Sequence, residues 1–179
     1  MKRNHLINMA WMQALWFAAV IGAAHKQTWP AVIILLTFAW WQLEPSRRQS
    51  SDLQIIPVAV FIGMVLDSSW IKLGWIQFSN PEPVPHMAPI WILLLWTGLA
   101  LTVNHSLGWL QGKLVLAGSV SGLVSPFSYL AAQRLGAVHI ISDSWSWFFG
   151  LAICWALALP FLLWLAGHLQ EINSGKLDV

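Results

Sequence analysis

Hydrophobic residues in this chain form six long runs separated by short polar segments. Most runs approach the length of about 20 residues that an α-helix needs to cross a bilayer core of roughly 30 Å. The runs predict transmembrane helices over residues 6–24, 29–43, 53–70, 88–110, 114–135 and 145–169. We therefore predict a single integral membrane domain over residues 1–179, all-α, built as a bundle of six transmembrane helices.

Proline and glycine add local detail to these helices. Pro30 and Pro57 each fall in the first turn of a predicted helix, where a missing N–H removes no helical hydrogen bond. In the fifth helix, Gly118 and Gly122 stand four residues apart and predict close packing against a neighbouring helix. Pro126 predicts a kink in the same helix because it frees a backbone carbonyl.

Composition agrees with the membrane interpretation. Only 9% of the residues are charged and 58% are hydrophobic, whereas soluble proteins carry about 25% charged residues. The net charge of +2 is explained by basic loops, so nucleic acid is not an expected partner. The single cysteine, Cys154, excludes an intramolecular disulfide. No closely spaced histidines, paired cysteines or Gly-rich phosphate loop occur, so we expect neither a metal nor a cofactor.

Basic residues predict the orientation of the bundle. With the N-terminus inside, six of them fall in cytoplasmic segments and three fall on the opposite side, which favours an N-in/C-in arrangement. The six are Lys2, Arg3, Arg47, Arg48, Lys113 and Lys176, and the three are Lys26, Lys72 and Arg134.

The chain contains 14 tryptophans, and most of them fall near predicted helix ends, where an indole ring anchors at the membrane interface. These anchors are Trp29, Trp40, Trp41, Trp70, Trp75, Trp91, Trp109, Trp145, Trp147 and Trp164. Four fall deeper and are expected to serve packing, namely Trp11, Trp16, Trp96 and Trp155. A shift of 80 residues superposes several tryptophans, as an inverted internal repeat would, but tryptophan is abundant and little else matches, so coincidence is the favoured interpretation.

Asp67 is the sharpest candidate for chemistry, because a carboxylate late in the third helix is costly unless it is paired, protonated or turned inward. Arg134, at the end of the fifth helix, is its expected partner, and Tyr129 lies one turn before Arg134. His25 joins them in a predicted outer polar cluster, with Lys72 and His139 as further members. This cluster is interpreted either as an anion-binding site or as a structural ion pair.

A second polar cluster is predicted near the inner face. Asn104, His105 and Ser106 lie in the fourth predicted helix, and Asn8, Gln13 and Gln111 are expected nearby. Histidine moves protons near neutral pH, and asparagine orients a ligand. Hydrogen bonding between helices is the alternative interpretation.

Short motifs in a consistent order carry a resemblance that covers nearly the whole chain. They are Trp16-Phe17 with Gly22-Ala23, Gly63 with Asp67, Pro89-Ile90-Trp91 with Trp96, Asn104-His105-Ser106-Leu107 with Trp109-Leu110, and Pro126 with Tyr129 and Leu135-Gly136-Ala137. In these the chain resembles a family of small bacterial inner-membrane proteins of unknown function. The resemblance implies a multi-pass protein of the bacterial inner membrane, with relatives associated with genes for fatty-acyl modification. It supplies no catalytic residues.

Three functional hypotheses remain open from the sequence. The first is an inner-membrane protein that binds or handles a lipid or other amphiphile, as an accessory to fatty-acyl modification. The second is a small-solute or proton-coupled transporter, in which the two polar clusters mark the ends of one pathway. The third is a structural subunit that binds another membrane protein. The sequence does not decide whether the protein is an enzyme, and membrane lipids are the expected partners.

Overall fold

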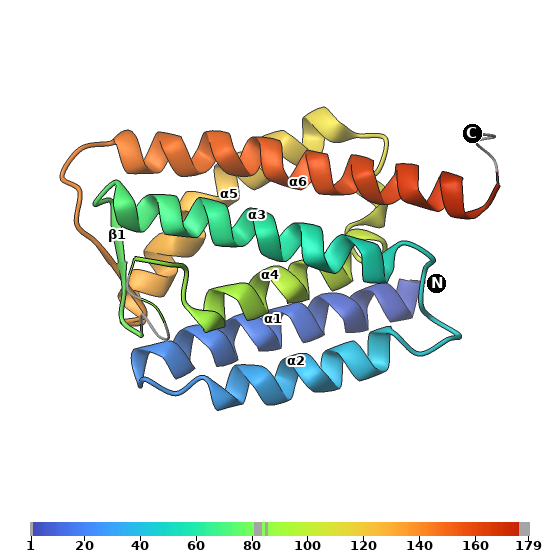
Figure 1. Cartoon of the computed structure of the whole chain (residues 1–179), viewed down its shortest axis with the longest axis horizontal. Helices are drawn as coiled ribbons and strands as arrows, with labels where there is room; N and C mark the ends of the chain where they lie inside the picture. The colour runs from blue at the N-terminus through green and yellow to red at the C-terminus, as the bar shows by residue number, and fades with distance from the viewer. Residues whose placement is uncertain (1, 81–83, 85, 176–179) are drawn as a thin grey trace.

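A computed structural model describes residues 2–80, 84 and 86–175, in which six α-helices run side by side (Figure 1). The helices are α1 (Lys2–Ala24), α2 (Trp29–Gln42), α3 (Asp52–Lys72), α4 (Ile90–Val103), α5 (Leu114–Arg134) and α6 (Ser146–Asn173). A short 3-10 helix, η1 (Gly108–Leu110), follows α4, and two strands that are distant in sequence, β1 (Ile76–Phe78) and β2 (Val138–Ile140), form an antiparallel pair. The predicted bundle of six helices is found, whereas six membrane crossings stay a prediction.

Four helices are long and apolar enough to cross a membrane, namely α1, α3, α5 and α6. The other two, α2 and α4, have 14 residues each, which at 1.5 Å per residue is about 21 Å and shorter than a bilayer core. The fourth helix was predicted to reach residue 110, but it ends at Val103. It ends there because Asn104 and its neighbours turn their side chains towards other helices, as described below.

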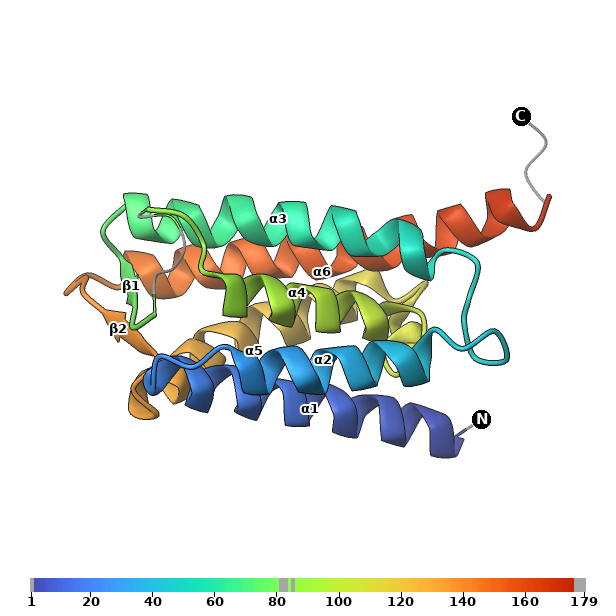
Figure 2. The ribbon, with the colours of Figure 1, turned by 60° about the horizontal axis from the view of Figure 1, so that its bottom comes forward.

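The strand pair is the one element type that the all-helical prediction missed. β1 and β2 are antiparallel, with Ile76 opposite Ile140 and Phe78 opposite Val138. Each strand has three residues, which is too short for its alternating pattern to stand out beside helices of 14 to 28 residues. The pair covers one end of the bundle (Figure 2). Lys176, one of the basic residues predicted to be cytoplasmic, lies outside the described residues.

The two glycines of α5 pack against α6 as predicted. A methyl group at position 118 would lie 2.8 Å from the carbonyl oxygen of Ala156, and one at position 122 would lie 2.9 Å from that of Ala152. Neither space admits a larger side chain, so the glycines allow close approach of the backbones. Pro30 stands in the first turn of α2 as expected, whereas Pro57 lies inside α3 because that helix begins at Asp52.

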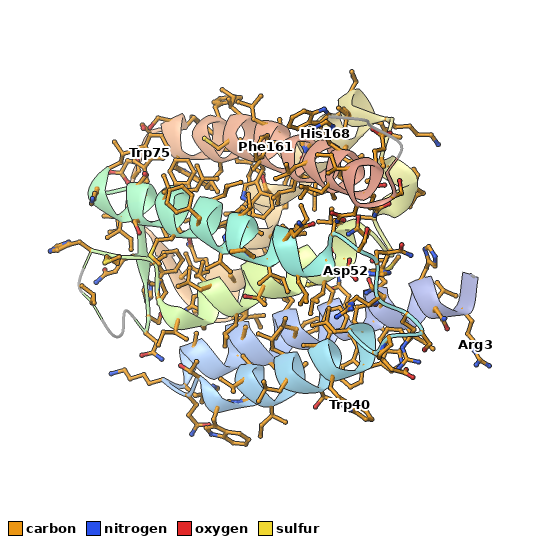
Figure 3. All side chains as sticks on the ribbon, turned by 45° about the vertical axis from the view of Figure 1, so that its right-hand side comes forward. Arg3, Trp40, Asp52, Trp75, Phe161 and His168 are labelled. Carbon is orange, nitrogen blue, oxygen red and sulfur yellow. The ribbon has the colours of Figure 1, made fainter. Side chains whose placement is uncertain are left out.

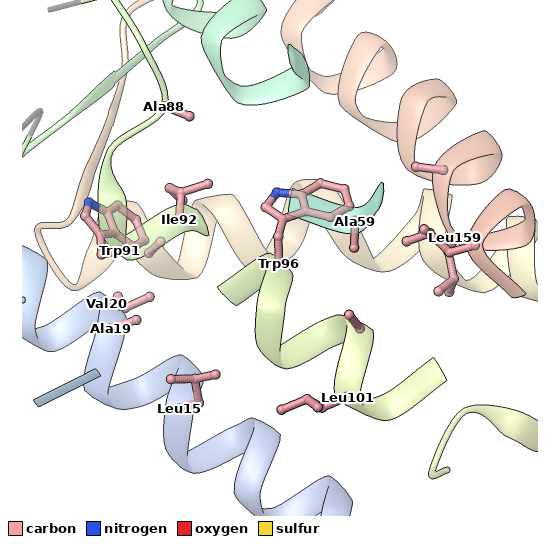
Figure 4. Packing of buried hydrophobic residues seen from close by; sticks show 14 of the residues in the cluster. Leu15, Ala19, Val20, Ala59, Ala88, Trp91, Ile92, Trp96, Leu101 and Leu159 are labelled. Atoms are coloured by element: carbon pink, nitrogen blue, oxygen red, sulfur yellow. The ribbon is translucent and has the colours of Figure 1, made fainter. Parts of the chain in front are cut away.

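The interior is formed by large apolar side chains from every helix, including Leu15, Phe38 and Trp91. Figure 4 shows Trp91 and Trp96 projecting from α4 into this core. The outer surface is also apolar, as expected where lipid replaces water. Trp29, Trp40, Trp109, Trp145 and Trp164 are exposed, in agreement with interfacial anchoring, and Trp40 points away from the bundle in Figure 3.

Three predicted anchors are buried instead, namely Trp70, Trp91 and Trp147. Trp91 is covered because β1 places Phe78 edge-on against its ring, at a centroid distance of 5.5 Å. Trp70 is stacked on Trp75 at 5.4 Å. Side chains at helix ends therefore pack here under the strands and loops.

An 80-residue repeat, which the tryptophan positions alone could indicate, does not match the element bounds. The shift carries α2 onto residues 109–122, which comprise most of η1, a loop and the start of α5. The coincidences of tryptophan positions therefore do not reflect repeated helices. The start of α1 and the end of α6 lie at the same end of the bundle (Figure 1), and the N-in/C-in orientation stays a prediction.

Candidate functional site: a groove between α1, α4 and α5

A cavity of about 360 Å³ lies among α1, α4 and α5. Most of its wall is apolar and aromatic, with Trp16 from α1, Trp96 from α4 and Trp155 from α6. Val138 of β2 closes one end. We call this cavity the groove. Its size falls within the range of about 300–1,000 Å³ that is typical of small-molecule sites.

The groove opens between α1 and α5. Gln13 on α1 and Val124 on α5 both line it and are both exposed. Each stands at the middle of a helix long enough to span a membrane. The apolar side chains Phe17 and Leu123 flank these positions on the outer surface. The mouth of the groove therefore lies midway along two helices that are long and apolar enough to cross a membrane.

Asp67 lies behind the wall of the groove and is completely buried. Trp96 donates its indole N–H to Oδ2 of Asp67 over 2.8 Å, and Tyr129 donates its hydroxyl to Oδ1 over 2.5 Å. Each carboxylate oxygen thus accepts one hydrogen bond, from a different helix. Both donors line the groove, so Asp67 fixes the position of two of its wall residues.

The Trp96 ring fits closely between its neighbours. It stacks on Trp155 of α6 with ring centroids 4.7 Å apart and an interplanar angle of 15°. On its other side α3 presents Gly63, where an added methyl group would lie 2.2 Å from Cδ1 of Trp96. Only glycine leaves room for the indole there, because real contacts of this kind do not fall below about 3 Å. The Gly63 and Asp67 pair, one turn apart on α3, therefore holds the ring in place.

Two polar atoms in the lining residues are buried without a hydrogen-bond partner among the residues that the structure describes. They are Oγ of Ser125 and Nε1 of Trp91. A buried polar group without a partner costs about 1–3 kcal/mol, and native structures contain few of them. Both residues line the groove.

The structure brings only part of the predicted outer cluster together. Asp67 and Tyr129 are in contact, but Arg134 is exposed at the end of α5 and forms no ion pair with Asp67 among the described salt bridges. Asp67 points into the bundle, whereas Arg134 reaches the surface beyond the last turn of α5. His25 follows the last residue of α1 and is exposed, with its Nδ1 2.9 Å from the carbonyl oxygen of Ile21. Lys72 and His139 are exposed as well.

The predicted inner cluster is present and is centred on a residue that the sequence did not single out. Asp52 begins α3 and is completely buried. Its Oδ2 lies 2.9 Å from Nε2 of His105, and its Oδ1 accepts 2.8 Å from Nδ2 of Asn104. The Asn104 oxygen in turn accepts hydrogen bonds from Gln111 and Gln170. Figure 3 shows Asp52 at the end of the bundle opposite the strand pair.

Asn8 extends this network to α1 and α2. Its Nδ2 donates to Oε1 of Gln42 over 2.7 Å and to the carbonyl of Leu101 over 2.9 Å. Its Oδ1 accepts the hydroxyl of Ser106 over 2.6 Å. Gln13, predicted here, lies instead at the mouth of the groove. The network thus joins α1, α2, α3 and α6 around the turn that ends α4.

Asp52, Gln42 and Gln170 escaped the sequence analysis because each stands at a helix end, where polar residues are ordinarily solvated. A carboxylate at the start of a helix is a common capping residue, so Asp52 gave no separate signal. Every side chain of the network has partners, which favours the structural interpretation of this cluster. Within the described ranges, no group of three His, Cys, Asp or Glu residues is placed to hold a metal.

Comparison with known proteins gives one match. No curated protein and no solved structure matches the chain. The sequence model of one family matches residues 5–161, which is nearly the whole chain and includes every groove residue named above. The chain therefore belongs to this family, described as Protein of unknown function (DUF2878).

Proposed function

We propose that this protein binds the chain of a membrane lipid or other amphiphile in the groove between α1, α4 and α5. The observation that carries the proposal is an apolar cavity of about 360 Å³ that opens between two membrane-spanning helices at their midpoints. A water-soluble ligand has no aqueous route to such a mouth, whereas an acyl or isoprenoid chain is already dissolved beside it.

The rigidity of the wall supports binding rather than loose packing. Asp67 holds Trp96 and Tyr129 from behind, and Trp155 is stacked on Trp96. A preorganised wall loses little conformational freedom when a ligand enters, so more of the contact energy contributes to affinity. The aromatic rings give the large apolar contact area that such a ligand needs.

The location in the bacterial inner membrane and a role as an accessory to fatty-acyl modification belong to this proposal. A transporter that links the two polar clusters fits less well. The buried positions of α3 between Asp52 and Asp67 are Ile55, Ala59 and Gly63, so that face of the helix offers no polar step between the clusters.

Filling the groove tests the proposal. Ser128 of α5 is half-buried and lines the cavity, so Ser128→Trp projects an indole into the space. Leu123→Trp is the matched control, because Leu123 lies on the exposed face of the same helix and outside the groove. Both variants and the unmodified protein are purified in mild detergent, and co-purifying lipid is measured by native mass spectrometry and extraction.

We expect a defined lipid to remain with the unmodified protein and with Leu123→Trp, and to be lost from Ser128→Trp. Circular dichroism must show the same helix content in all three proteins. Equal lipid retention in both tryptophan variants would contradict the proposal, since annular lipid does not depend on the groove. Bare protein in every sample would contradict it as well.

A further inference from the structure

We propose that the groove selects an uncharged amphiphile that carries a hydroxyl group, and that this hydroxyl lies against Ser125 and Tyr129 of α5. The inference rests on the proposed function and names the chemical class of its ligand. It follows from the polar atoms that the groove presents, from the charges that it lacks and from the depth at which these atoms lie.

Most polar side chains inside the groove come from α5, while Gln13 of α1 lies at its mouth. Ser125 and Tyr129 are one turn apart on this helix, and both line the groove. Ser121, one turn earlier, already donates to the carbonyl of Trp155 over 2.8 Å. Ser125 is 93% buried, and its hydroxyl has no partner in the described part of the chain. A hydroxyl inside a helix of an apolar protein ordinarily bonds a carbonyl of the preceding turn, as Ser119 does with Val115.

Tyr129 offers the groove an acceptor rather than a donor. Its hydroxyl hydrogen points to Asp67, so its oxygen can only accept hydrogen bonds, and the indole N–H groups of Trp70 and Trp155 lie near the same oxygen. Ser125 both donates and accepts. A ligand hydroxyl therefore completes both groups at once, because it donates to the Tyr129 oxygen and accepts from Ser125. An ether or an ester lacks the hydrogen that Tyr129 needs.

Charge selects against ionised headgroups. None of the described residues that line the groove is Lys, Arg, His, Asp or Glu. A carboxylate or phosphate in the groove would have no cation to compensate its charge and would lie close to the buried carboxyl group of Asp67. The cost of placing an unpaired anion in this apolar space excludes fatty acids and phospholipid headgroups from the position beside Ser125.

The position of Ser125 along α5 also argues against a phospholipid headgroup beside it. Ser125 is next to the middle residue of α5, whereas phospholipid headgroups lie at the helix ends, half a bilayer away. A polar group at mid-depth belongs to a molecule that is immersed as a whole, such as a long-chain alcohol, or to a hydroxyl within a chain. Trp91, with its unpartnered indole N–H nearer the strand pair, supplies a second donor for a longer ligand.

The test uses three probes with the same chain and different polar ends, namely hexadecanol, hexadecyl methyl ether and palmitate. The full-length protein in phosphatidylcholine nanodiscs is titrated with each probe in mildly alkaline buffer, where palmitate is ionised, and bound probe is counted by native mass spectrometry. The variant is Ser125→Ala, and Ser119→Ala is the matched control, since Ser119 is exposed on the same helix and does not line the groove.

We expect hexadecanol to bind roughly fivefold more tightly than its methyl ether, which is the effect of about one hydrogen bond, and palmitate to bind most weakly. Ser125→Ala should remove the preference for hexadecanol over the ether while leaving the ether unchanged, and Ser119→Ala should leave both unchanged. Equal binding of all three probes, or a preference that survives Ser125→Ala, would overturn the headgroup assignment while leaving chain binding intact. Failure of every probe to compete with groove-bound lipid would overturn chain binding itself.

Discussion

Trp96 of α4 and Asp67 of α3 are joined by a hydrogen bond of 2.8 Å from the indole N–H to a completely buried carboxylate oxygen. The same carboxylate accepts the hydroxyl of Tyr129 from α5, so one acidic residue ties three helices together. Because Trp96 and Tyr129 also form part of the wall of the groove, the stability of the bundle and the shape of the groove depend on the same contacts.

Replacing Asp67 should weaken the bundle, whereas replacing Arg134 should not. Asp67→Ala leaves the Trp96 N–H and the Tyr129 hydroxyl buried without their acceptor. We expect the free energy of unfolding to fall by about 1–2 kcal/mol for each donor left without its acceptor. This is less than in a water-soluble protein, because polar groups of the unfolded chain also form hydrogen bonds within a membrane. Arg134→Ala should change the free energy of unfolding by no more than about 0.5 kcal/mol, because that side chain is exposed.

Unfolding by sodium dodecyl sulfate in mixed micelles, followed by circular dichroism, measures both free energies. Equal losses in the two variants would show that Asp67 and Arg134 act as a pair and would refute the arrangement described here.

Gly63→Ala tests the close fit of the Trp96 ring. The added methyl group would lie 2.4 Å from Nε1 of Trp96, so the indole must shift and its bond to Asp67 must weaken. Overpacking of this kind costs about 1–3 kcal/mol. Gly167→Ala is the control, because a methyl group at that position in α6 meets nothing within 4 Å and should raise stability by up to about 1 kcal/mol.

Thermal unfolding in detergent, monitored by circular dichroism, compares the two glycine variants. A Gly63→Ala protein as stable as Gly167→Ala would mean that Trp96 has free space beside α3.

Asn104→Ala should destabilise the protein without affecting the groove. Asn104 bonds Ser51, Asp52, Gln111 and Gln170, and its loss leaves buried Asp52 short of a donor. We expect a decrease of about 1–3 kcal/mol in the free energy of unfolding, with lipid retention unchanged. Asn173→Ala serves as the control, since its bond to Gln54 is exposed. Loss of bound lipid from a folded Asn104→Ala protein would assign the inner cluster to function instead.

The positions of the helices were predicted well because a long apolar run in a chain with few charges is typical of a helix that crosses a membrane. Helix ends were harder to predict. Asn104 interrupts an apolar run in the middle of a predicted helix, and a polar residue there is compatible both with a continued helix and with a turn. The turn is favoured by partners on α3 and α6, which lie more than 50 residues away in sequence.

The pairing of Asp67 with Arg134 was predicted from their opposite charges, and the structure does not contain this pair among its described salt bridges. Asp67 and Arg134 have opposite charges and lie towards the same end of the bundle, so their attraction suggested a pair. The structure satisfies Asp67 with two neutral donors, and Trp96 was expected only to pack. No pattern along the chain indicates that Gly63 clears the space through which that indole reaches Asp67. The groove escaped prediction as well, because its walls come from separate helices.

The most direct measurement of the central claim is a crystal structure grown from lipid in the presence of a long-chain alcohol with a bromine atom at the end of its chain. The bromine marks the ligand through its anomalous scattering. We predict a bromine peak between α1 and α5, inside the groove lined by Trp16, Trp96 and Trp155, with the hydroxyl beside Ser125. Bromine peaks confined to the outer surface, with the groove filled by rearranged side chains, would contradict the account.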